Sequence, residues 1–449
     1  MAQKPSIPKG TRDFSPVEMK RRNYIFSVIT KVFKRYGFEQ IETPAMENLS
    51  TLMGKYGDEG DRLIFKILNS GDYLKKVNDK ILQEKNSNQL TKYICEKALR
   101  YDLTVPFARY VVMHQNDITF PFKRFQIQPV WRADRPQKGR YREFYQCDAD
   151  IIGSDSLLNE VDLIKIFDDV LTELKIPDYT IHINNRKILS GLAEVFDIAD
   201  KIIDFTVAVD KLDKVGNEGV LKELAQKGFT EKQLDEIASF LQEEPGLAQL
   251  KNRLSTSETG LKGVEELEEV MNYVTQIGLK SAKLKFDVTL ARGLNYYTGA
   301  IFEVKVKDFP SICGGGRYDD LTGVFGVKGL SGVGISFGAD RIYDIMLATN
   351  AFPDFTQDQT EVMFVNFGKQ ETAYCLPVLF ALREKGINAE LYPDNVKMKK
   401  QMKFANEKGV KYVVMAGENE MKDDTLTVKN MHEGSQDTIS KNEFLKMFN

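Results

Sequence analysis

Cysteine and histidine are scarce in this sequence of 449 residues, and their scarcity narrows the available chemistry. The four cysteines lie far apart and form no C-x-x-C pair, so neither a disulfide framework nor a zinc cluster is indicated. The three histidines are equally scattered, without an H-E-x-x-H pattern or an acidic residue at ligand spacing. A histidine-based catalyst or metal centre is therefore not expected, and the sequence assigns no metal ligands.

Long apolar runs are also missing. No apolar stretch approaches the ~18 residues that cross a bilayer, and the opening MAQKPSIPKG lacks the apolar segment of a secretory signal. We therefore expect a cytoplasmic protein with no membrane partner. The net charge of -3 gives no overall attraction to nucleic acid, so any binding of RNA or a nucleotide must come from local patches.

One such patch is WRADRPQKGRYREF, residues 131–144, which places five cationic side chains between Arg132 and Arg142. It lies between FKRFQIQPVWR and REFYQCDADII, in which aromatic and aliphatic residues alternate with polar ones. This alternation predicts a strand, a loop and a second strand. The patch therefore lies in a loop between two strands, where a polyanion can approach it.

Regions with the apolar spacing of helices lie before and after these strands in the sequence. Apolar spacing predicts an amphipathic helix over 16–36 and a long helix over 157–174. Residues 70–98 are lysine-rich with sparse apolar residues, which indicates a surface insertion carrying short helices. Residues 186–280 are mostly helical in pattern, and few of their turns look catalytic. The strand pattern returns over 284–346.

Polar residues on the second predicted strand form a candidate binding surface. Gln146, Asp148 and Asp150 share one strand face, and Asp102 lies in the segment LRYDLTVPF. Such a lining binds an ammonium group or an imidazole N–H by charge-assisted hydrogen bonds. The alternative is a strand whose polar residues simply face water.

Four arginines, Arg132, Arg140, Arg292 and Arg341, lie beside glycines or in loops next to predicted strands. They could converge on phosphates, or each could be an ordinary surface arginine. Two unit charges about 4 Å apart attract by about 4 kcal/mol at an effective dielectric near 20. Three arginines around a triphosphate would therefore offset much of the repulsion that a second anion meets at the α-phosphorus. The segment GVGISFG has the wrong glycine spacing for a dinucleotide fingerprint, which argues against a nicotinamide enzyme.

Together these segments resemble the histidyl-tRNA synthetases, class II aminoacyl-tRNA synthetases, along nearly the whole chain. PKGTRDF (8–14) resembles the family's opening signature, and the segment up to Pro44 resembles motif 1, which builds the dimer interface. WRADRPQKGRYREF is similar to motif 2, and GVGISFGADRI is similar to motif 3. LARGLNYYTG (290–299) and CGGGRYDDL (313–321) resemble the two histidine-specific segments of this family and its close relatives.

The resemblance implies an α+β fold, in which helices flank the antiparallel sheet of a class II synthetase. It implies a catalytic domain at 1–185 and 281–348, a mostly helical insertion at 186–280, a linker at 349–360 and an α/β anticodon-binding domain at 361–449. It also implies activation of L-histidine by ATP to histidyl-adenylate and transfer to the 3′ end of tRNA(His). Mg²⁺ would share the pyrophosphate charge, and two copies would form a homodimer through the motif 1 region.

Site residues follow from the same resemblance. For ATP, the α-phosphate would be held by Arg132, the adenine end by Asp134, and the outer phosphates by Arg140 and Arg341. Arg292 would bridge the histidine carboxylate and the α-phosphate, so the residues closest to the chemistry are Arg132, Arg292 and Arg341. The α-amino group of histidine would be held by Asp102, Thr104 and Gln146, and the imidazole by Asp150, Tyr297 and Tyr318.

The chain departs from the family pattern at three of these positions. Asn295 stands where aspartate is common, and Asp134 and Asp150 are shorter than the glutamates of many bacterial members. The main alternative is a synthetase-like regulatory subunit of histidine biosynthesis, which shares the catalytic fold but makes no adenylate. Such relatives lose the phosphate arginines and lack the last domain, both of which this chain has.

Overall fold

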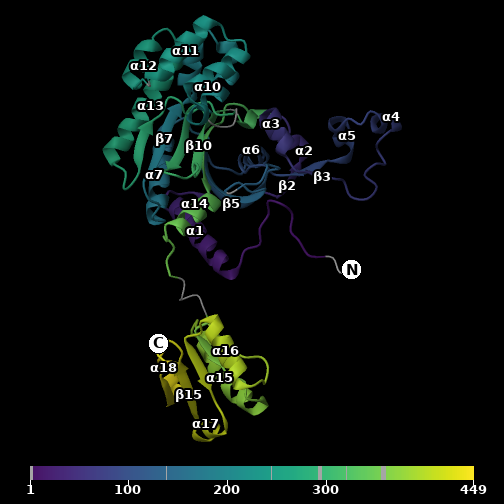
Figure 1. Cartoon of the computed structure of the whole chain (residues 1–449), viewed down its shortest axis with the longest axis vertical. Helices are drawn as coiled ribbons and strands as arrows, with labels where there is room; N and C mark the ends of the chain where they lie inside the picture. The colour runs from purple at the N-terminus through teal and green to yellow at the C-terminus, as the bar shows by residue number, and fades with distance from the viewer. Residues whose placement is uncertain are drawn as a thin grey trace. The chain divides into compact units, whose positions relative to one another are not determined.

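The computed structural model describes residues 4–448 except 138, 244, 292–295, 320 and 355–359, and except the side chains of 57–59. The chain divides into two compact units, Met1–Phe352 and Pro353–Asn449 (Figure 1). No helix in the described part of the chain is long and apolar enough to cross a membrane.

The first unit is built on an eight-stranded sheet that is antiparallel except at its two edges. In spatial order its strands are β1 (Glu39–Gln40), β5 (Phe122–Trp131), β6 (Glu143–Ile152), β11 (Ser331–Gly338), β10 (Cys313–Asp319), β9 (Ala300–Val306), β7 (Tyr179–Asn185) and β8 (Lys283–Phe286). The edge pairs β1–β5 and β7–β8 are parallel, because in each case a long crossover returns the chain to the same end of the sheet. The α+β fold class is confirmed, with this difference at the edges.

Three helices cover one face of this sheet: α1 (Pro16–Arg35), α7 (Leu158–Glu173) and α14 (Ala339–Ala348) (Figure 1). α1 buries Ile25, Ile29 and Phe33, which recur every four residues and so share one side of the helix. The ring of Phe33 packs against Phe125 of β5 and Phe337 of β11, with centroid distances of 5.4 and 5.9 Å. The helices predicted over 16–36 and 157–174 are confirmed to within a residue at each end.

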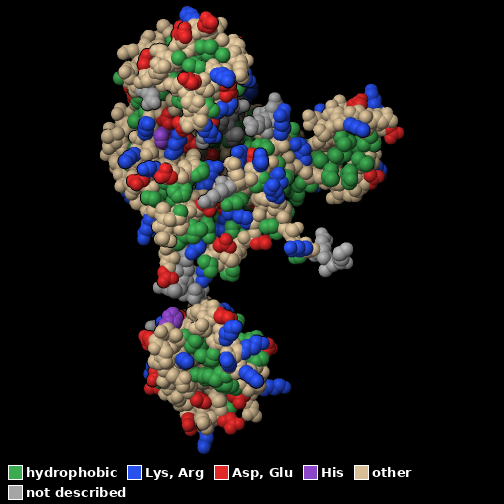
Figure 2. All heavy atoms as spheres, viewed as in Figure 1, with side chains coloured by type: hydrophobic (Ala, Val, Ile, Leu, Met, Phe, Trp, Pro, Cys, Tyr) green, Lys and Arg blue, Asp and Glu red, His purple; other side chains and the backbone are tan. Residues whose placement is uncertain are grey.

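The residues between β1 and β5 form a lobe of the first unit. Its elements are β2 (Met46–Asn48), α2 (Leu49–Leu52), α3 (Gly57–Leu63), β3 (Lys66–Ile67), α4 (Asp79–Gln83), α5 (Ser87–Ile94), β4 (Lys97–Leu99) and α6 (Thr104–Met113). α4 and α5 bury none of their residues, and Figure 2 shows hydrophobic side chains grouped on the part of the lobe that carries them. The surface insertion with short helices predicted over 70–98 is confirmed.

The crossover between β7 and β8 consists of helices. They are α8 (Arg186–Val195), the 3-10 turn η1 (Ala199–Lys201), α9 (Ile202–Val209), α10 (Leu212–Gln226), α11 (Glu231–Glu243), α12 (Leu247–Arg253) and α13 (Glu258–Ile277). α8 and α13 approach closely at Gly191 and Gly260, where a Cβ on Gly191 would lie 2.5 Å from the Cα of Gly260. Because Met1–Phe352 is one compact unit, the division into a catalytic domain and an insertion stays a prediction.

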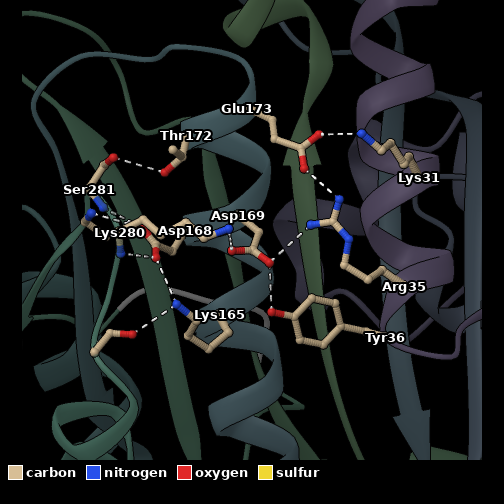
Figure 3. A network of polar contacts seen from close by, with 12 residues as sticks. Lys31, Arg35, Tyr36, Lys165, Asp168, Asp169, Thr172, Glu173, Lys280 and Ser281 are labelled. Atoms are coloured by element: carbon tan, nitrogen blue, oxygen red, sulfur yellow. Dashed lines mark hydrogen bonds and ion pairs between the residues drawn. The ribbon is translucent and has the colours of Figure 1, made fainter.

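The buried carboxylate of Asp168 links α7 to the end of this crossover by hydrogen bonds (Figure 3). Asp168 accepts hydrogen bonds from the backbone N–H groups of residues Lys280, Ser281 and Ala282, at 2.5, 3.0 and 3.0 Å, and from Lys165 Nζ at 3.1 Å. The neighbouring Asp169 accepts a hydrogen bond from Tyr36 at the end of α1. These two carboxylates therefore connect α1, α7 and the entry to β8, which leads on to the 287–297 segment.

Removing the Asp168 charge should cost stability in a pH-dependent way. Burial opposes its charge, but the backbone N–H donors of 280–282 and Lys165 outweigh this and lower the pKa of Asp168 to about 2. A lowered pKa stabilises the fold above the ordinary pKa of 3.8, and this contribution is lost as pH falls through about 2. We expect Asp168→Asn to lower the free energy of unfolding by about 2 kcal/mol above pH 5, and by about half of that at pH 3.

Urea unfolding of both proteins between pH 3 and pH 7 measures this difference. Asp162→Asn is the matched control on the same helix, because Asp162 is 39% exposed and, among the described residues, its ion pair is with Lys123 at 2.8 Å. That variant should lose less than about 1 kcal/mol. A pH-independent loss in Asp168→Asn would contradict the linkage.

The second unit is a smaller sheet with helices on both faces. Its elements are β12 (Val362–Phe364), α15 (Lys369–Glu384), β13 (Ala389–Leu391), α16 (Met398–Lys408), β14 (Tyr412–Met415), α17 (Glu418–Asp423), β15 (Thr425–Asn430), β16 (Gln436–Ser440) and α18 (Lys441–Lys446). The strand order is β13-β12-β14-β15-β16, parallel across β13, β12 and β14. Alternate residues of β12 belong to separate cores, Val362 and Phe364 to one and Met363 to the other. This unit therefore has its own hydrophobic cores.

Candidate active site

A cavity of about 750 Å³ opens on the first unit. It is lined by β6, β10 and β11, by the loop between β5 and β6, and by the starts of α6 and α14. Ten of the eleven site residues expected from sequence line it: Asp102, Thr104, Arg132, Asp134, Arg140, Gln146, Asp150, Tyr297, Tyr318 and Arg341. The eleventh, Arg292, and the unusual Asn295 lie outside the described residues. Segments far apart in the sequence thus contribute to one cavity.

Strand β6 supplies the acidic side of this cavity. Gln146, Asp148 and Asp150 alternate along the strand and all three line the cavity, as the period-two pattern predicts. Their partners on β11 are Gly338, Ser336 and Gly334. A Cβ on Gly334 would lie 2.0 Å from Asp150 Oδ1, so only glycine leaves room for that carboxylate. The small residues of GVGISFG therefore make space for the β6 carboxylates.

Asp150 contacts both a tyrosine hydroxyl and an arginine. It is buried, accepts a hydrogen bond from the Tyr318 hydroxyl at 2.7 Å, and lies 2.7 Å from Arg124 Nη2 of β5. That ion pair lacks hydrogen-bond geometry, and among the described residues no nitrogen of the Arg124 guanidinium has a hydrogen-bond partner. Burial raises the pKa of Asp150, and the Arg124 charge opposes this rise. Arg124 therefore favours the ionised form of Asp150.

Two buried oxygens in this part of the cavity, one of Asp102 and one of Gln146, have no hydrogen-bond donor among the described residues. The Tyr56 hydroxyl and the Val105 N–H both donate to Asp102 Oδ1, at 2.9 and 3.2 Å. Asp102 Oδ2 and Gln146 Oε1 are buried and have no hydrogen-bond partner among the described residues. Buried acceptors of this kind are costly unless a ligand satisfies them. A ligand with several N–H donors, such as an ammonium group, fits them.

The acidity of Asp148 is strongly altered by its surroundings. Burial raises the pKa of Asp148 to about 7, an effect that the charges of Asp150 and Asp102 add to and that Arg124 opposes. The pKa values of Tyr297 and Tyr318 also rise on burial, so both phenols remain protonated donors. The floor of the cavity therefore combines carboxylate acceptors with hydroxyl donors.

The basic side of the cavity comes from the β5–β6 loop and α14. Arg132 donates from Nε to the Tyr101 carbonyl at 3.0 Å, and its guanidinium lies over the rings of Tyr101 and Phe144. Arg341 donates from Nε to the Gly139 carbonyl at 3.4 Å and from Nη1 to the Ser311 carbonyl. These contacts orient the guanidinium groups of Arg132 and Arg341, which are more than two hundred residues apart in sequence and line the same cavity.

Arg140 forms an ion pair with Asp134 at 2.8 Å, which pattern reasoning did not anticipate. The Arg140 side chain is 50% exposed, whereas that of Asp134 is 10% exposed. Because a guanidinium has five N–H donors, Arg140 is accessible to a phosphate while it remains paired with Asp134.

The segment PKGTRDF braces the β5–β6 loop. Gly10 has φ +89° and accepts a hydrogen bond from the Arg142 N–H at 2.9 Å. A Cβ there would lie 2.8 Å from Arg142 Cγ, so glycine is required. Arg12 lies over the Tyr141 ring and donates to Asp340 of α14 at 2.6 Å. This explains how an opening segment without cavity-lining residues supports the site.

Pattern reasoning missed several charged residues of the cavity region, namely Arg124, Asp210, Lys214, Glu303 and Asp340. Asp148 was recognised on the correct strand face but received no specific role. Arg124 could have been found if the register of the β5–β6 hairpin had been known, since it pairs with Asp150. Asp210 and Lys214 come from the α9–α10 turn, and nothing in the local pattern distinguishes that turn from others in the helical stretch.

Comparison with known proteins gives a consistent result. The family model described as histidyl-tRNA synthetase matches residues 88–342, and the model described as anticodon binding domain matches residues 361–449. The histidine–tRNA ligase of Phocaeicola vulgatus is 59% identical over 99% of both chains. That of Christiangramia forsetii is 58% identical over 98% of both.

Solved structures agree. The histidyl-tRNA synthetase of Nostoc sp. PCC 7120 has a TM-score of 0.80 at 30% identity, over 100% of this chain and 99% of that one. An ATP phosphoribosyltransferase regulatory subunit/histidyl-tRNA synthetase of Bacillus halodurans has a TM-score of 0.72 at 19% identity, over 92% of this chain and 99% of that one. At that identity the second likeness shows the fold alone.

Proposed function

Because this chain belongs to the histidyl-tRNA synthetase family, we propose that the cavity on its first unit binds ATP and L-histidine side by side. The protein activates L-histidine with ATP to histidyl-adenylate and transfers the histidyl group to the 3′ end of tRNA(His). The observation that carries the site assignment is the convergence of ten expected residues on one cavity.

The ATP half of the cavity is its basic side. Arg132 holds the α-phosphate, Arg140 and Arg341 hold the outer phosphates, and Asp134 lies at the adenine end. The packing of Arg132 over two rings supports this role, because it aims the guanidinium without neutralising it. The start of α14 beside Arg341 adds the positive end of a helix dipole. Arg292 bridges the histidine carboxylate and the α-phosphate, a role that rests on family resemblance.

The histidine half is the acidic side. Asp102, Thr104 and Gln146 hold the α-amino group, which the unpartnered oxygens of Asp102 and Gln146 support. Asp150, Tyr297 and Tyr318 line the imidazole, with Asp150 beside Arg124 as an acceptor for an imidazole N–H. Asp148, between these groups, strengthens the negative potential that holds the substrate cation.

Catalysis requires no protein nucleophile. A carboxylate oxygen of histidine attacks the α-phosphorus in line, the bond from that phosphorus to the bridging oxygen breaks, and pyrophosphate leaves with the electron pair. The terminal ribose hydroxyl of tRNA(His) then attacks the carbonyl carbon of the adenylate, and AMP leaves. The protein orients the reactants and stabilises the charge that develops in each step.

Mg²⁺ fits the outer end of the cavity. It is usually held by one or two carboxylates together with substrate phosphates and waters, so it needs no cluster of three protein ligands. No cluster of three His, Cys, Asp or Glu residues that could hold a metal exists among the described residues. Glu303 is the cavity-lining carboxylate we assign to this ion. When bound, Mg²⁺ shares the charge of the leaving pyrophosphate.

The remaining assignments concern assembly and location. We place the anticodon contact on the second unit, residues 361–449, which the anticodon-binding model supports. We place a homodimer contact in the motif 1 region, so a chain lacking 361–449 should still sediment as a dimer. Cysteines 95, 147, 313 and 375 are all free and buried, which favours a cytoplasmic location.

Histidine recognition should depend on the ionisation of Asp148. With a pKa near 7, protonation of Asp148 weakens the pull on the substrate ammonium group, so the KM for histidine should rise as pH falls below 7. Asp148→Asn removes this titration and should raise the KM roughly tenfold at pH 8 while flattening its pH dependence. Histidine-dependent ATP–pyrophosphate exchange between pH 6 and pH 8.5 measures both effects.

The imidazole of the substrate histidine titrates near pH 6.5 in the assays of both proteins. The difference between the pH profiles of wild type and Asp148→Asn therefore isolates the contribution of Asp148. Exchange with each of the other amino acids completes the experiment. Equal pH profiles for the two proteins would remove Asp148 from the histidine site. Exchange supported equally by another amino acid would overturn the substrate assignment.

A further inference from the structure

The turn between α9 and α10 brings a lysine from the helical crossover to the adenylation cavity. Asp210 ends α9, Lys214 lies in the first turn of α10, and both side chains line the cavity that holds the expected ATP residues. Elsewhere the helices of the crossover pack mainly on one another, on β7 and on α7. This turn is therefore a point where it reaches the reaction site.

An ion pair links the turn to β9. Asp213, next to Lys214, pairs with Lys305 of β9 at 2.9 Å, and Lys305 is also 3.6 Å from Glu303. Glu303 and Gly314 are direct partners in the β9–β10 pairing. The α9–α10 turn is thus attached beside the connection between β9 and β10.

Arg341 approaches the same connection from α14. Its Nη1 donates to the carbonyl of Ser311, two residues before β10 begins, and the cavity lining continues through 310–315. Lys214 and Arg341 therefore flank one corner of the cavity, the corner assigned above to the outer phosphates of ATP.

The Lys214 ammonium group is available for a ligand. Neighbouring lysines are engaged, Lys211 with Glu223 at 2.6 Å and Lys305 with Asp213. Lys214 is exposed, and no ion pair to it is present in the part of the chain that the structure describes. An ammonium group on a flexible stem suits phosphate oxygens, because it needs no fixed approach geometry.

The backbone after Lys214 explains why α10 can turn toward the cavity. Gly216 has φ +68° and ψ 176°, a break inside the helix that favours glycine. No heavy atom lies within 4 Å of a Cβ built there, so the glycine serves backbone conformation and not packing. The first turn of α10 can thus follow a direction different from the rest of that helix.

We propose that Lys214 is a further phosphate-binding residue of the adenylation site, contacting the outer phosphates of ATP and the departing pyrophosphate. This inference rests on the proposed position of the outer phosphates beside Arg341. Negative charge accumulates on pyrophosphate as the bond to the α-phosphorus breaks, so a cation at this corner stabilises the transition state more than the bound substrate. The helical crossover then takes part in histidine activation.

Lys214→Ala in the full-length protein tests the proposal. In histidine-dependent ATP–pyrophosphate exchange we expect kcat/KM for ATP to fall roughly tenfold and the KM for pyrophosphate to rise, with the KM for histidine unchanged. Lys214→Arg should restore most of the lost activity. Lys222→Ala is the matched control, because it removes the same charge from an exposed position of α10 outside the cavity lining.

Three outcomes separate this inference from the site assignment on which it rests. If Lys214→Ala behaves like Lys222→Ala while Arg341→Ala loses exchange, the inference fails and the ATP site stands. If Arg341→Ala also keeps normal exchange, the position of the outer phosphates is wrong. If Lys214→Ala impairs only tRNA charging, the lysine contacts tRNA, and the assignment to ATP is overturned.

Discussion

Arg132→Ala is expected to lower the rate of histidine-dependent ATP–pyrophosphate exchange by about 10² to 10³-fold. The guanidinium is held by the Tyr101 carbonyl and by two aromatic rings, so it is already oriented before ATP binds. Loss of a single oriented donor that stabilises developing charge typically costs about 10² to 10³ in kcat. The KM for histidine should change little, because Arg132 lies on the basic side of the cavity.

Arg132→Lys sharpens this prediction. Lysine keeps the charge but cannot stack between rings or donate two parallel hydrogen bonds, so it should recover only a small part of the activity. Arg135→Ala is the matched control, since Arg135 is an exposed arginine of the same loop that does not line the cavity. Exchange by Arg132→Ala within a few-fold of the Arg135 variant would remove Arg132 from the α-phosphate.

The parts of the site that sequence predicted are those governed by local rules. Alternation along β6 placed Gln146, Asp148 and Asp150 on one face, and all three line the cavity. Spacing of apolar residues gave α1 and α7 nearly to their ends. The PKGTRDF and GVGISFG segments contain glycines whose close contacts, to Arg142 and to Asp150, require the absence of a side chain.

The parts that sequence could not predict depend on contacts between distant segments. Arg124 faces Asp150 because of the β5–β6 register. Arg12 and Arg22 both form ion pairs with Asp340, which is more than three hundred residues later in the sequence. Lys214 belongs to a helical stretch whose turns showed little sign of catalysis. That expectation stays a prediction, but two residues of the α9–α10 turn line the cavity, and the Asp213–Lys305 contact that ties the turn to β9 could not be read from its own sequence.

The buried Glu160 makes another contact between distant segments that the sequence could not predict. Arg317 of β10, in the segment CGGGRYDDL that resembles a histidine-specific segment of the family, donates to both oxygens of Glu160 at 2.5 and 2.6 Å. Both residues are buried, and Arg317 also donates to Ser331 and to two carbonyls near α7. Its neighbour Tyr318 reaches Asp150 from the next position. One residue of the segment thus anchors the strand while the next enters the site, a division of roles that composition cannot reveal.

Deletion of residues 361–449 should separate the two half-reactions. The cavity and its polar lining belong to the first unit, and the second unit has cores of its own, so adenylate formation should persist within a few-fold. Charging of tRNA(His) should fall much further, by roughly 10² to 10⁴ in kcat/KM, because one of two linked binding surfaces for tRNA is lost. Pyrophosphate exchange and aminoacylation, measured on the same preparation, give the two values.

The truncated chain supplies its own control for folding. Since we place the dimer contact in the motif 1 region, sedimentation equilibrium should give the same dimeric state as the full chain. A dimeric, exchange-competent chain that fails to charge tRNA places the anticodon contact on 361–449. Equal loss of exchange and charging by a chain that remains dimeric would mean that the second unit supports the cavity itself, and an independent anticodon module would then be excluded.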